Sequence, residues 1–161
     1  MMAGWTFGTF NVQGIRGRAK RVAVFDFLAL QRLSAFFVQE AHLRDSRDVQ
    51  GYRRDWAVGE SFWSVGGVHS SGVWVLLGDR GFRVTGVSEV VQGRVIGVDA
   101  EYGGVSFRLV CVYGAQRAGE RGELFRALLD LLVTNRVLVV GGDFNCVLGD
   151  QGDSSAGQLR D

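Results

Sequence analysis

The sequence predicts a layered α/β domain, and three observations support this prediction. The first 40 residues follow the order strand, helix, strand. The middle of the chain holds several segments rich in valine and aromatic residues, separated by short polar or glycine breaks, as expected of hairpins in an antiparallel sheet. A second segment of helical periodicity and a further apolar strand follow. The 161 residues suit one domain, and we find no internal repeat or linker.

The N-terminal part supplies the first three elements. We expect a strand over Thr6–Val12, a helix over Arg18–Leu33 and a buried strand over Ala35–Glu40. Four apolar residues of the helix recur at near-helical spacing and form one stripe: Val22, Phe25, Leu28 and Leu33. His42–Arg54 is polar and has no clear period, so no element is predicted there.

Five strands are predicted next, all rich in valine and aromatic residues: Trp56–Trp63, Gly72–Leu77, Phe82–Val90, Arg94–Tyr102 and Val105–Tyr113. The last two flank Gly103-Gly104, a signal for a tight hairpin. A helix over Glu120–Asn135 and a buried strand over Val137–Val140 follow. From Asp150 onward we expect a frayed loop.

The charge of the chain does not define a partner. A net charge of +1 gives no global positive field of the kind that marks a nucleic-acid binder. A local basic run contains Arg16, Arg18, Lys20 and Arg21. These residues are either the solvated start of a helix or a set of contacts to DNA phosphates, and the two interpretations have equal weight.

The remaining composition favours a soluble intracellular protein with no membrane partner. Cys111 and Cys146 lie in apolar strand-like segments, so we expect both to be reduced core residues. Met1–Phe10 lacks the charged and apolar regions of a secretory signal, and no apolar run approaches the length that spans a bilayer. With 24 glycines and no proline, the turns depend on glycine.

Polar side chains follow three of the predicted apolar strands. Asn11 comes after the first and Glu40 after the second, while Asp143 and Asn145 follow Val137–Val140. Sites collect at strand ends in layered sheets, and carboxylate and amide oxygens suit Mg²⁺ better than Zn²⁺. Taken singly, each residue is more often a turn former or a helix cap, so the prediction depends on their combination and order.

Five motifs in order along the chain resemble those of the endonuclease/exonuclease/phosphatase family: Thr9–Gly14, Gln39–Leu43, Ser71–Leu77, Val112–Ala115 and Gly141–Asn145. They are most similar to the endonuclease domains of non-LTR (LINE-type) retrotransposons, with exonuclease III and abasic-site endonucleases as the nearest relatives. The resemblance implies an α/β-sandwich of two packed, mostly antiparallel sheets flanked by helices. It also implies a Mg²⁺-dependent DNA phosphodiester hydrolase.

The resemblance implies a role for each matching residue. Glu40 would bind the catalytic Mg²⁺, or Mn²⁺ in its place, and Asn11 would lie in the outer shell of the metal or orient the scissile phosphate. Tyr113 would place its phenol near the phosphate, although without the motif it would be a buried strand aromatic. Asp143 would orient or deprotonate the attacking water, and Asn145 would donate to a phosphate oxygen.

Two histidines and the end of the chain depart from the family's catalytic pattern. His42 follows the metal-binding glutamate by two residues, and we expect it to support that glutamate or to pack the loop. His69 lies in a Gly/Ser loop and is expected to be solvated. The family's last motif, Ser-Asp-His, has no match before Asp161. We therefore expect a single domain over residues 1–161 that lacks its C-terminal third, incomplete at the C-terminus and severely reduced in catalysis.

Three functions remain open. A DNA phosphodiesterase would be either a retrotransposon nicking enzyme, which Gln39–Leu43 favours, or a repair enzyme acting at abasic sites and 3′ ends. Its partner would be double-stranded DNA, its compartment the nucleus and its context a polyprotein with reverse transcriptase. A catalytically dead remnant with at most weak metal or DNA binding is the second function. Phosphatase or sphingomyelinase activity, which the same fold supports, is the third.

Overall fold

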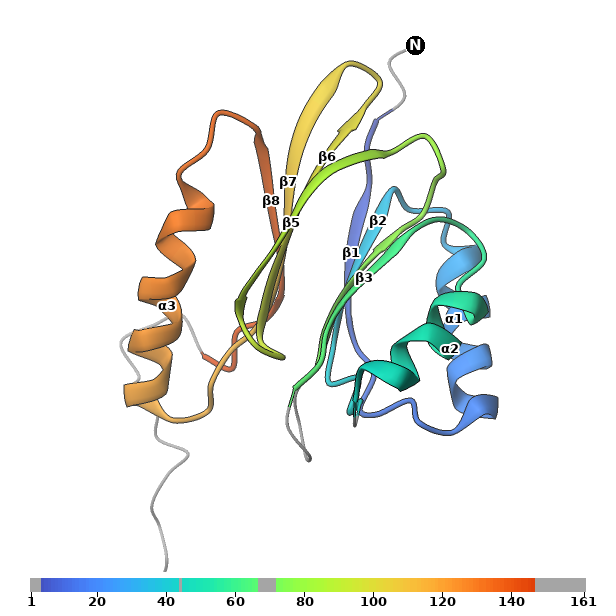
Figure 1. Cartoon of the computed structure of the whole chain (residues 1–161), viewed down its shortest axis with the longest axis horizontal. Coiled ribbons are helices and arrows are strands. Elements are labelled where there is room, and N and C mark those ends of the chain that lie inside the picture. The colour runs from blue at the N-terminus through green and yellow to red at the C-terminus, as the bar shows by residue number, and fades with distance from the viewer. Residues whose placement is uncertain (1–3, 44, 67–71, 147–161) are drawn as a thin grey trace, which may run out of the picture.

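The computed structural model describes residues 4–43, 45–66 and 72–146, and these form two β-sheets packed face to face (Figure 1). In chain order the elements are β1 (Phe7–Asn11), α1 (Arg18–Leu30), β2 (Ala35–Gln39), α2 (Ser46–Asp55), β3 (Ser61–Ser64), β4 (Val73–Leu77), β5 (Arg83–Val91), β6 (Val95–Tyr102), β7 (Val105–Tyr113), α3 (Ala118–Leu132) and β8 (Val137–Asp143). The strand orders are β1-β2-β4-β3 and β5-β6-β7-β8.

The expected α/β-sandwich of mostly antiparallel sheets is confirmed. Four strand pairs are antiparallel. The two parallel pairs, β1 with β2 and β7 with β8, are those whose strands are joined through a helix, α1 or α3. Parallel neighbours need such a crossover, because a short turn can join only antiparallel strands.

The three layers of side chains follow from the two-residue period of the strands. In β2, Ala35 and Phe37 face the second sheet, whereas Phe36 and Val38 face the helices α1 and α2. All five residues of β2 are buried, which explains why this strand is a continuous apolar run rather than an alternating one. On the other side, α3 covers the second sheet with Leu124, Leu128 and Leu131 (Figure 1).

The helix α2 lies in the polar stretch for which the sequence predicted no element. It begins after Asp45, whose carboxylate accepts hydrogen bonds from the backbone N–H groups of Arg47 and Asp48. The helix has 10 residues and buries only Val49 and Tyr52. An apolar stripe of two residues is too short to be recognised as a period, which explains the wrong prediction.

Other boundaries differ from the sequence prediction at the strand ends. The strand expected over Trp56–Trp63 is limited to β3, because Trp56 ends α2 and packs between Phe25 and Phe36. The Gly103-Gly104 hairpin is confirmed, and both glycines have the positive φ that such a turn requires, 57° and 80°.

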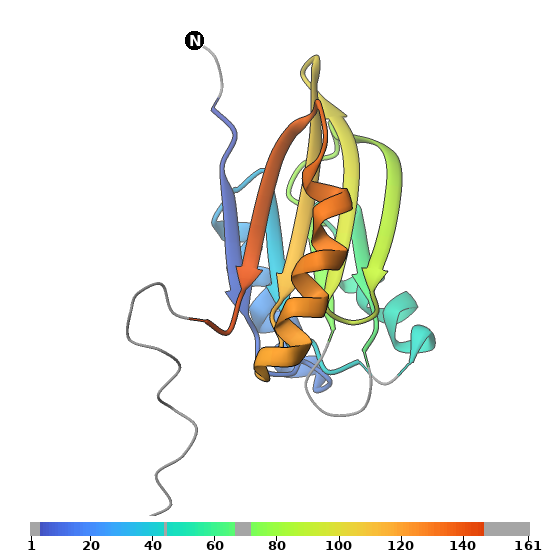
Figure 2. The ribbon, with the colours of Figure 1, turned by 90° about the vertical axis from the view of Figure 1, so that its left-hand side faces the viewer.

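Each sheet ends in an edge strand on the same side of the molecule. There β1 and β8 lie next to each other, and Figure 2 shows both facing the viewer. Val137 of β8 is 50% exposed, and Leu138 and Val140 are also exposed. Within the described residues, no helix is long and apolar enough to cross a membrane. His69 and the tail from Asp150 lie outside the described residues.

Candidate active site

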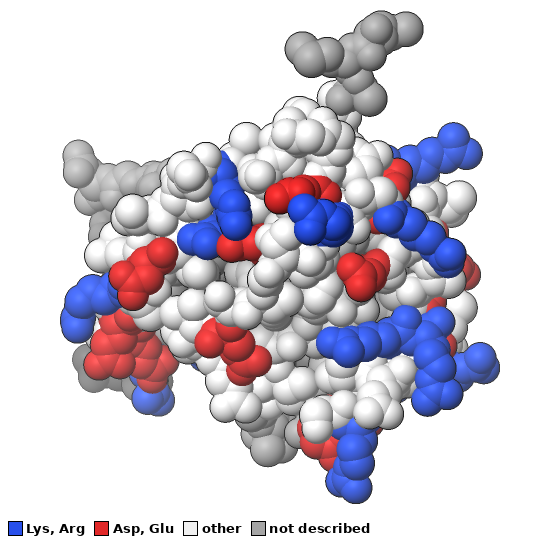
Figure 3. All heavy atoms as spheres, turned by 45° about the horizontal axis from the view of Figure 1, so that its top comes forward, with Lys and Arg blue, Asp and Glu red and all other residues white. Residues whose placement is uncertain are grey.

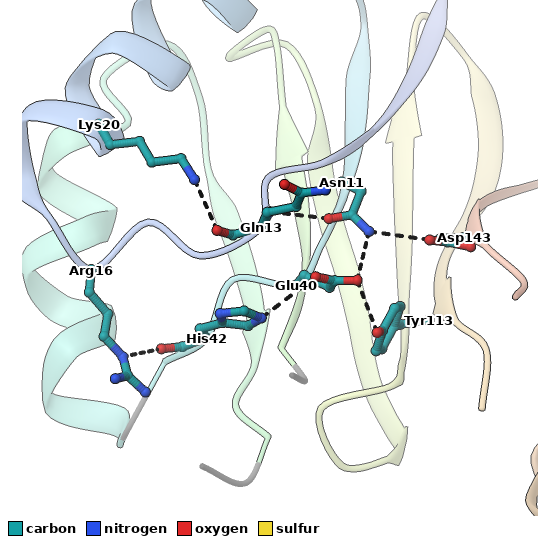
Figure 4. A network of polar contacts seen from close by, with 8 residues as sticks. All are labelled: Asn11, Gln13, Arg16, Lys20, Glu40, His42, Tyr113 and Asp143. Carbon is teal, nitrogen blue, oxygen red and sulfur yellow. Dashed lines mark hydrogen bonds and ion pairs between the residues drawn. The ribbon is translucent and has the colours of Figure 1, made fainter. Parts of the chain in front are cut away.

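The two parallel strand pairs bring the predicted polar residues together. The carboxyl ends of β1 and β2 meet, so Asn11 pairs with Gln39, the residue that precedes Glu40. The carboxyl ends of β7 and β8 also meet, with Tyr113 opposite Asp143. Figure 4 shows these four side chains converging from both sheets at one end of the sandwich. This arrangement requires the two crossovers, since antiparallel neighbours would end on opposite sides.

Asn11 joins the two sheets through its amide. Its Nδ2 donates to Glu40 Oε1 at 2.9 Å and to Asp143 Oδ2 at 3.2 Å (Figure 4). Its Oδ1 accepts from the backbone N–H of Gln13 at 3.1 Å, which fixes the orientation of the amide. A neutral group with two N–H donors can hold two carboxylates near each other, whereas a third carboxylate here would repel both.

The same Glu40 oxygen accepts a hydrogen bond from the Tyr113 hydroxyl at 3.0 Å. Tyr113 is buried. Burial, and after it the hydrogen bond to Glu40, raises the pKa of the Tyr113 phenol above its ordinary value. Tyr113 is therefore a protonated donor at neutral pH.

Asp143 and Asn145 form a local turn around the end of β8. The Asn145 backbone N–H donates to Asp143 Oδ1 at 3.0 Å, and its side-chain Nδ2 donates to the Gly114 carbonyl at 2.7 Å. The Gly114 N–H in turn donates to the Asp143 carbonyl at 2.7 Å. Asn145 has a φ of 49°, a left-handed conformation that asparagine tolerates. The strand end is thereby locked against Gly114.

His42 lies beside Glu40, as the sequence analysis expected. Its Nε2 is 3.6 Å from Glu40 Oε2. The backbone carbonyl of His42 accepts from Arg16 Nε at 2.7 Å (Figure 4). Arg16 is thus tied to the rim of the site.

The four basic residues of the local run occupy different environments. Arg16, Arg18 and Lys20 are exposed, and Lys20 Nζ donates to the Gln13 carbonyl at 2.9 Å. Arg21 is buried, and its Nε forms a salt bridge of 2.7 Å with Asp55. An arginine engaged in this way is not available to DNA, so the sequence-based grouping of Arg21 with the other three is wrong. The remaining three stay candidates for phosphate contacts.

A face remote from this rim has mixed charge. Figure 3 tilts the top of the view in Figure 1 toward the viewer, whereas the site lies at the lower end of β1 and β8. Lysine and arginine side chains are interspersed with aspartate and glutamate on that face, in agreement with the net charge of +1.

A buried polar network supports the site from behind. Gln39 Nε2 donates to Thr9 Oγ1 at 3.0 Å and to the Phe37 carbonyl at 2.8 Å, and it contacts Cys111 Sγ at 3.5 Å. Burial raises the pKa of the Cys111 thiol to about 12, so Cys111 is an inert core thiol as expected. Cys146 is exposed, which contradicts the prediction of a core residue, because it lies beyond the end of β8.

Arg94 is a residue of this site that the sequence did not reveal. It lies in the turn between β5 and β6, and its Nη1 donates to the carbonyls of Gly114 at 3.1 Å and Tyr113 at 3.4 Å. Its guanidinium carbon is 5.3 Å from the centroid of the Tyr113 ring. The Tyr113 N–H donates to the Arg94 carbonyl at 2.7 Å. A lone arginine after a turn glycine gives no signal of this contact in the sequence.

A cavity of about 390 Å³ opens beside Asn11 and Asp143, lined by Thr9, Phe10, Asn11, Gln39, Gly142, Asp143, Phe144, Asn145 and Cys146. Among the described residues, no group of three or more His, Cys, Asp or Glu side chains is arranged to hold a metal. The possible metal ligands at this end of the sandwich are the carboxylates of Glu40 and Asp143, the amide oxygen of Asn11 and one imidazole nitrogen. That nitrogen, His42 Nε2, is buried and lacks a hydrogen-bond partner in the described chain. This small set fits a divalent cation that keeps several waters.

One curated protein is similar to this chain in sequence. The chain is 27% identical over 161 residues to the Transposon TX1 uncharacterized 149 kDa protein of Xenopus laevis, covering 97% of this chain and 12% of that protein. It therefore spans about one eighth of the length of the curated relative that it matches.

Three solved structures share the fold. A humanized D. rerio TDP2 has a TM-score of 0.70 at 15% identity, over 89% of this chain and 67% of that one. An AP endonuclease from Archaeoglobus fulgidus has a TM-score of 0.66 at 18% identity, over 88% and 58%. The endonuclease domain of TRAS1, a telomere-specific non-LTR retrotransposon, has a TM-score of 0.63 at 14% identity, over 89% and 62%. Residues 8–159 match the sequence profile of one family, and the chain therefore belongs to the Endonuclease/Exonuclease/phosphatase family.

Proposed function

We propose that this chain is a divalent-metal-dependent DNA phosphodiester hydrolase derived from the nicking endonuclease of a retrotransposon. The observation that carries the proposal is the convergence of Asn11, Glu40, Tyr113 and Asp143 from two sheets at one end of the sandwich. Family membership supports hydrolysis of phosphate esters as the general chemistry. The similarity to a transposon protein and to a retrotransposon endonuclease favours nicking of intact duplex over repair.

The proposed roles follow from what each side chain already contacts. Glu40 would hold the cation, Mg²⁺ or alternatively Mn²⁺, which would stabilise the negative charge that builds on the phosphate and leaving oxygens. Asn11 keeps the Glu40 and Asp143 carboxylates in place. The Tyr113 hydroxyl, which stays protonated and here donates to Glu40, would turn to donate to a non-bridging phosphate oxygen when substrate binds.

The two residues after β8 would act on the attacking water and the phosphate. Asp143 would orient the water and accept its proton, as a carboxylate general base does. Asn145 uses one N–H of its side-chain amide to hold Gly114, and its second N–H is the donor that we assign to the phosphate. Arg16, Arg18 and Lys20 would contact backbone phosphates on either side of the scissile bond.

Double-stranded DNA is the proposed partner, and chromosomal DNA as the target implies a nuclear location. We further propose that the chain is one part of a larger polyprotein that includes reverse transcriptase, because the curated relative is a 149 kDa transposon protein of which this chain covers 12%. Expression of the longer reading frame, followed by an assay of primed DNA synthesis by reverse transcriptase, tests the proposal of a polyprotein.

The central experiment compares two labelled duplexes in the presence of Mg²⁺ or Mn²⁺. One is intact and supercoiled, and the other carries an abasic site. The variants Glu40→Gln and Asp143→Asn are compared with the matched controls Glu60→Gln and Asp26→Asn, whose carboxylates are exposed and lie outside the site.

Nicking of the intact duplex that only the two site variants abolish would support the proposal. Preferred cleavage of the abasic duplex would assign the chain to the repair branch. Absence of cleavage by a folded protein would refute catalysis by this chain and favour the catalytically dead remnant that at most binds metal or DNA weakly.

A further inference from the structure

The loop after β2 has an unusual backbone that aims two side chains at the same place. Glu40 and His42 have φ values of 57° and 55°, a left-handed conformation that is uncommon outside glycine. Between them, Ala41 is fully buried. Backbone hydrogen bonds hold Glu40 and Ala41: Gly14 N–H to Glu40 O at 2.7 Å, Ala41 N–H to Gly72 O at 3.1 Å and Ile15 N–H to Ala41 O at 3.3 Å. The loop geometry is thus fixed on both sides.

The position of the imidazole is also built by its neighbours. Gly14 has a φ of 77°, and a Cβ atom there would lie 2.8 Å from His42 Nδ1, so glycine leaves the room that the ring occupies. Arg16 holds the His42 carbonyl at 2.7 Å. The ring therefore points toward Glu40 rather than into solvent, and Figure 4 shows the two side chains facing each other.

A carboxylate oxygen and a ring nitrogen face each other at this point. Glu40 Oε1 accepts from Asn11 and Tyr113, which leaves Oε2 facing His42 Nε2 at 3.6 Å. This separation is longer than a hydrogen bond. The Nε2 atom is buried and has no hydrogen-bond partner among the described residues. A buried nitrogen without a partner is unusual in a native structure and calls for a ligand or ion.

We propose that His42 Nε2 and Glu40 Oε2 bind the same divalent cation, and that the imidazole makes the site prefer Mn²⁺ to Mg²⁺. Adjacent ligands of an octahedral ion with bonds of about 2.1 Å lie about 3 Å apart, so a small side-chain rotation closes the gap. Mg²⁺ selects oxygen ligands, whereas Mn²⁺ binds more tightly than Mg²⁺ once a nitrogen ligand is present. The inference rests on the proposed function, since it concerns the cation held by Glu40, and it gives His42 a direct role instead of loop packing.

Calorimetric titration of the full 161-residue chain with Mn²⁺ or Mg²⁺ alone tests the preference. In the unaltered protein we expect Mn²⁺ to bind at least tenfold more tightly than Mg²⁺. His42→Ala and His42→Gln should weaken Mn²⁺ binding about tenfold and Mg²⁺ binding less than threefold, which removes most of the preference. Asp26→Asn is the control and should change neither affinity.

A spectroscopic measurement identifies the ligand without a variant. Electron spin-echo spectroscopy of bound Mn²⁺ should show modulation from a directly coordinated imidazole nitrogen, and ¹⁵N-labelled histidine should change its frequency. The modulation should disappear in His42→Ala, which separates His42 from His69.

The outcomes distinguish the two proposals. Loss of binding in Glu40→Gln, with an unchanged Mn²⁺ preference in both His42 variants and no histidine modulation, would overturn the role of His42 while leaving the metal site at Glu40 intact. Unchanged binding in Glu40→Gln, or no binding of either ion to the folded chain, would overturn the proposed function and the inference together.

Discussion

Arg21 is the residue for which sequence and structure lead to opposite expectations, and its replacement distinguishes them. Its Nε donates to Asp55 Oδ2 at 2.7 Å, and its Nη1 donates to the carbonyls of Arg16 at 3.1 Å and Ile15 at 3.3 Å. Its guanidinium carbon lies 3.9 Å from the centroid of the Tyr52 ring. The group thereby joins the start of α1 to the end of α2.

The expected cost of Arg21→Ala follows from this environment. Removing one partner of a buried ion pair costs about 3 to 5 kcal/mol, because the other charge remains buried without compensation. The side chains of Arg21 and Asp55 are 9% and 21% exposed, so water can partly solvate Asp55 after the change. We therefore expect the lower end, a loss of about 3 kcal/mol in the free energy of unfolding.

Urea unfolding followed by tryptophan fluorescence measures this loss. With a slope of about 2 kcal/mol per molar urea, the midpoint should fall by roughly 1.5 M. Arg18→Ala is the matched control: Arg18 is exposed, and its replacement should change stability by less than about 0.5 kcal/mol.

Arg21→Lys separates a structural role from a phosphate contact. Lysine keeps the charge but lacks the planar fork that engages Asp55 and two carbonyls, so this variant should also be destabilised. A loss below about 1 kcal/mol in Arg21→Ala, together with weaker DNA binding, would refute the structural role. Arg18→Ala should show the opposite result. Its stability should be unchanged, and the slope of log affinity for DNA against log salt concentration should fall by the equivalent of about one phosphate contact.

Three further predictions concern other parts of the fold. The hydrogen bond from Arg108 lowers the pKa of Asp99 below its ordinary value of 3.8. The stability that ionised Asp99 contributes is therefore complete above pH 3.8 and is lost as the pH falls further. Acid unfolding of Asp99→Asn should depend less on pH than acid unfolding of the control Asp26→Asn. Arg94→Ala should slow DNA cleavage about tenfold, with partial recovery in Arg94→Lys, because the Gly114 carbonyl loses a charged donor; equal rates would contradict this. Gly141→Ala should lower the free energy of unfolding by about 1 to 3 kcal/mol, because the added Cβ clashes with the Phe37 ring. Gly51→Ala should raise it by up to about 1 kcal/mol, because a Cβ there meets nothing and alanine favours the helix. Thermal unfolding of both variants measures the two changes.

The elements predicted correctly are those whose signal lies in residues adjacent in sequence. The continuous apolar run of β2 and the Gly103-Gly104 turn were visible because each depends on residues adjacent in sequence. In contrast, α2 depends on one capping carboxylate, Asp45, and on two buried residues, and no periodicity in its sequence indicates a helix. Tryptophan is enriched in strands, but Trp56 ends α2 and packs its ring against Phe36 of the first sheet.

The identity of the site residues was easier to predict than their contacts. Asn11, Glu40 and Asp143 were found because each follows an apolar strand and matches a motif. The sequence did not show that a single amide joins both carboxylates, because the contact spans 132 positions between Asn11 and Asp143. The contact of Arg94 with Gly114 could not be predicted for the same reason, because the two residues are 20 positions apart.

The backbone around the site carries a strain that only the complete sandwich can hold. Among the described non-glycine residues, positive φ occurs at Gln13, Arg32, Glu40, His42 and Asn145, and four of these five surround the site. Each such residue costs of order 1 kcal/mol or more, and it persists only where its surroundings determine the conformation. Here the surroundings are the Asn11 amide, the Gly114 contacts and the buried loop around Ala41, which come from both sheets. The geometry of the site is therefore a property of the packed sandwich, and the free energy of its core offsets the strain at the residues that we propose to bind the metal and the phosphate.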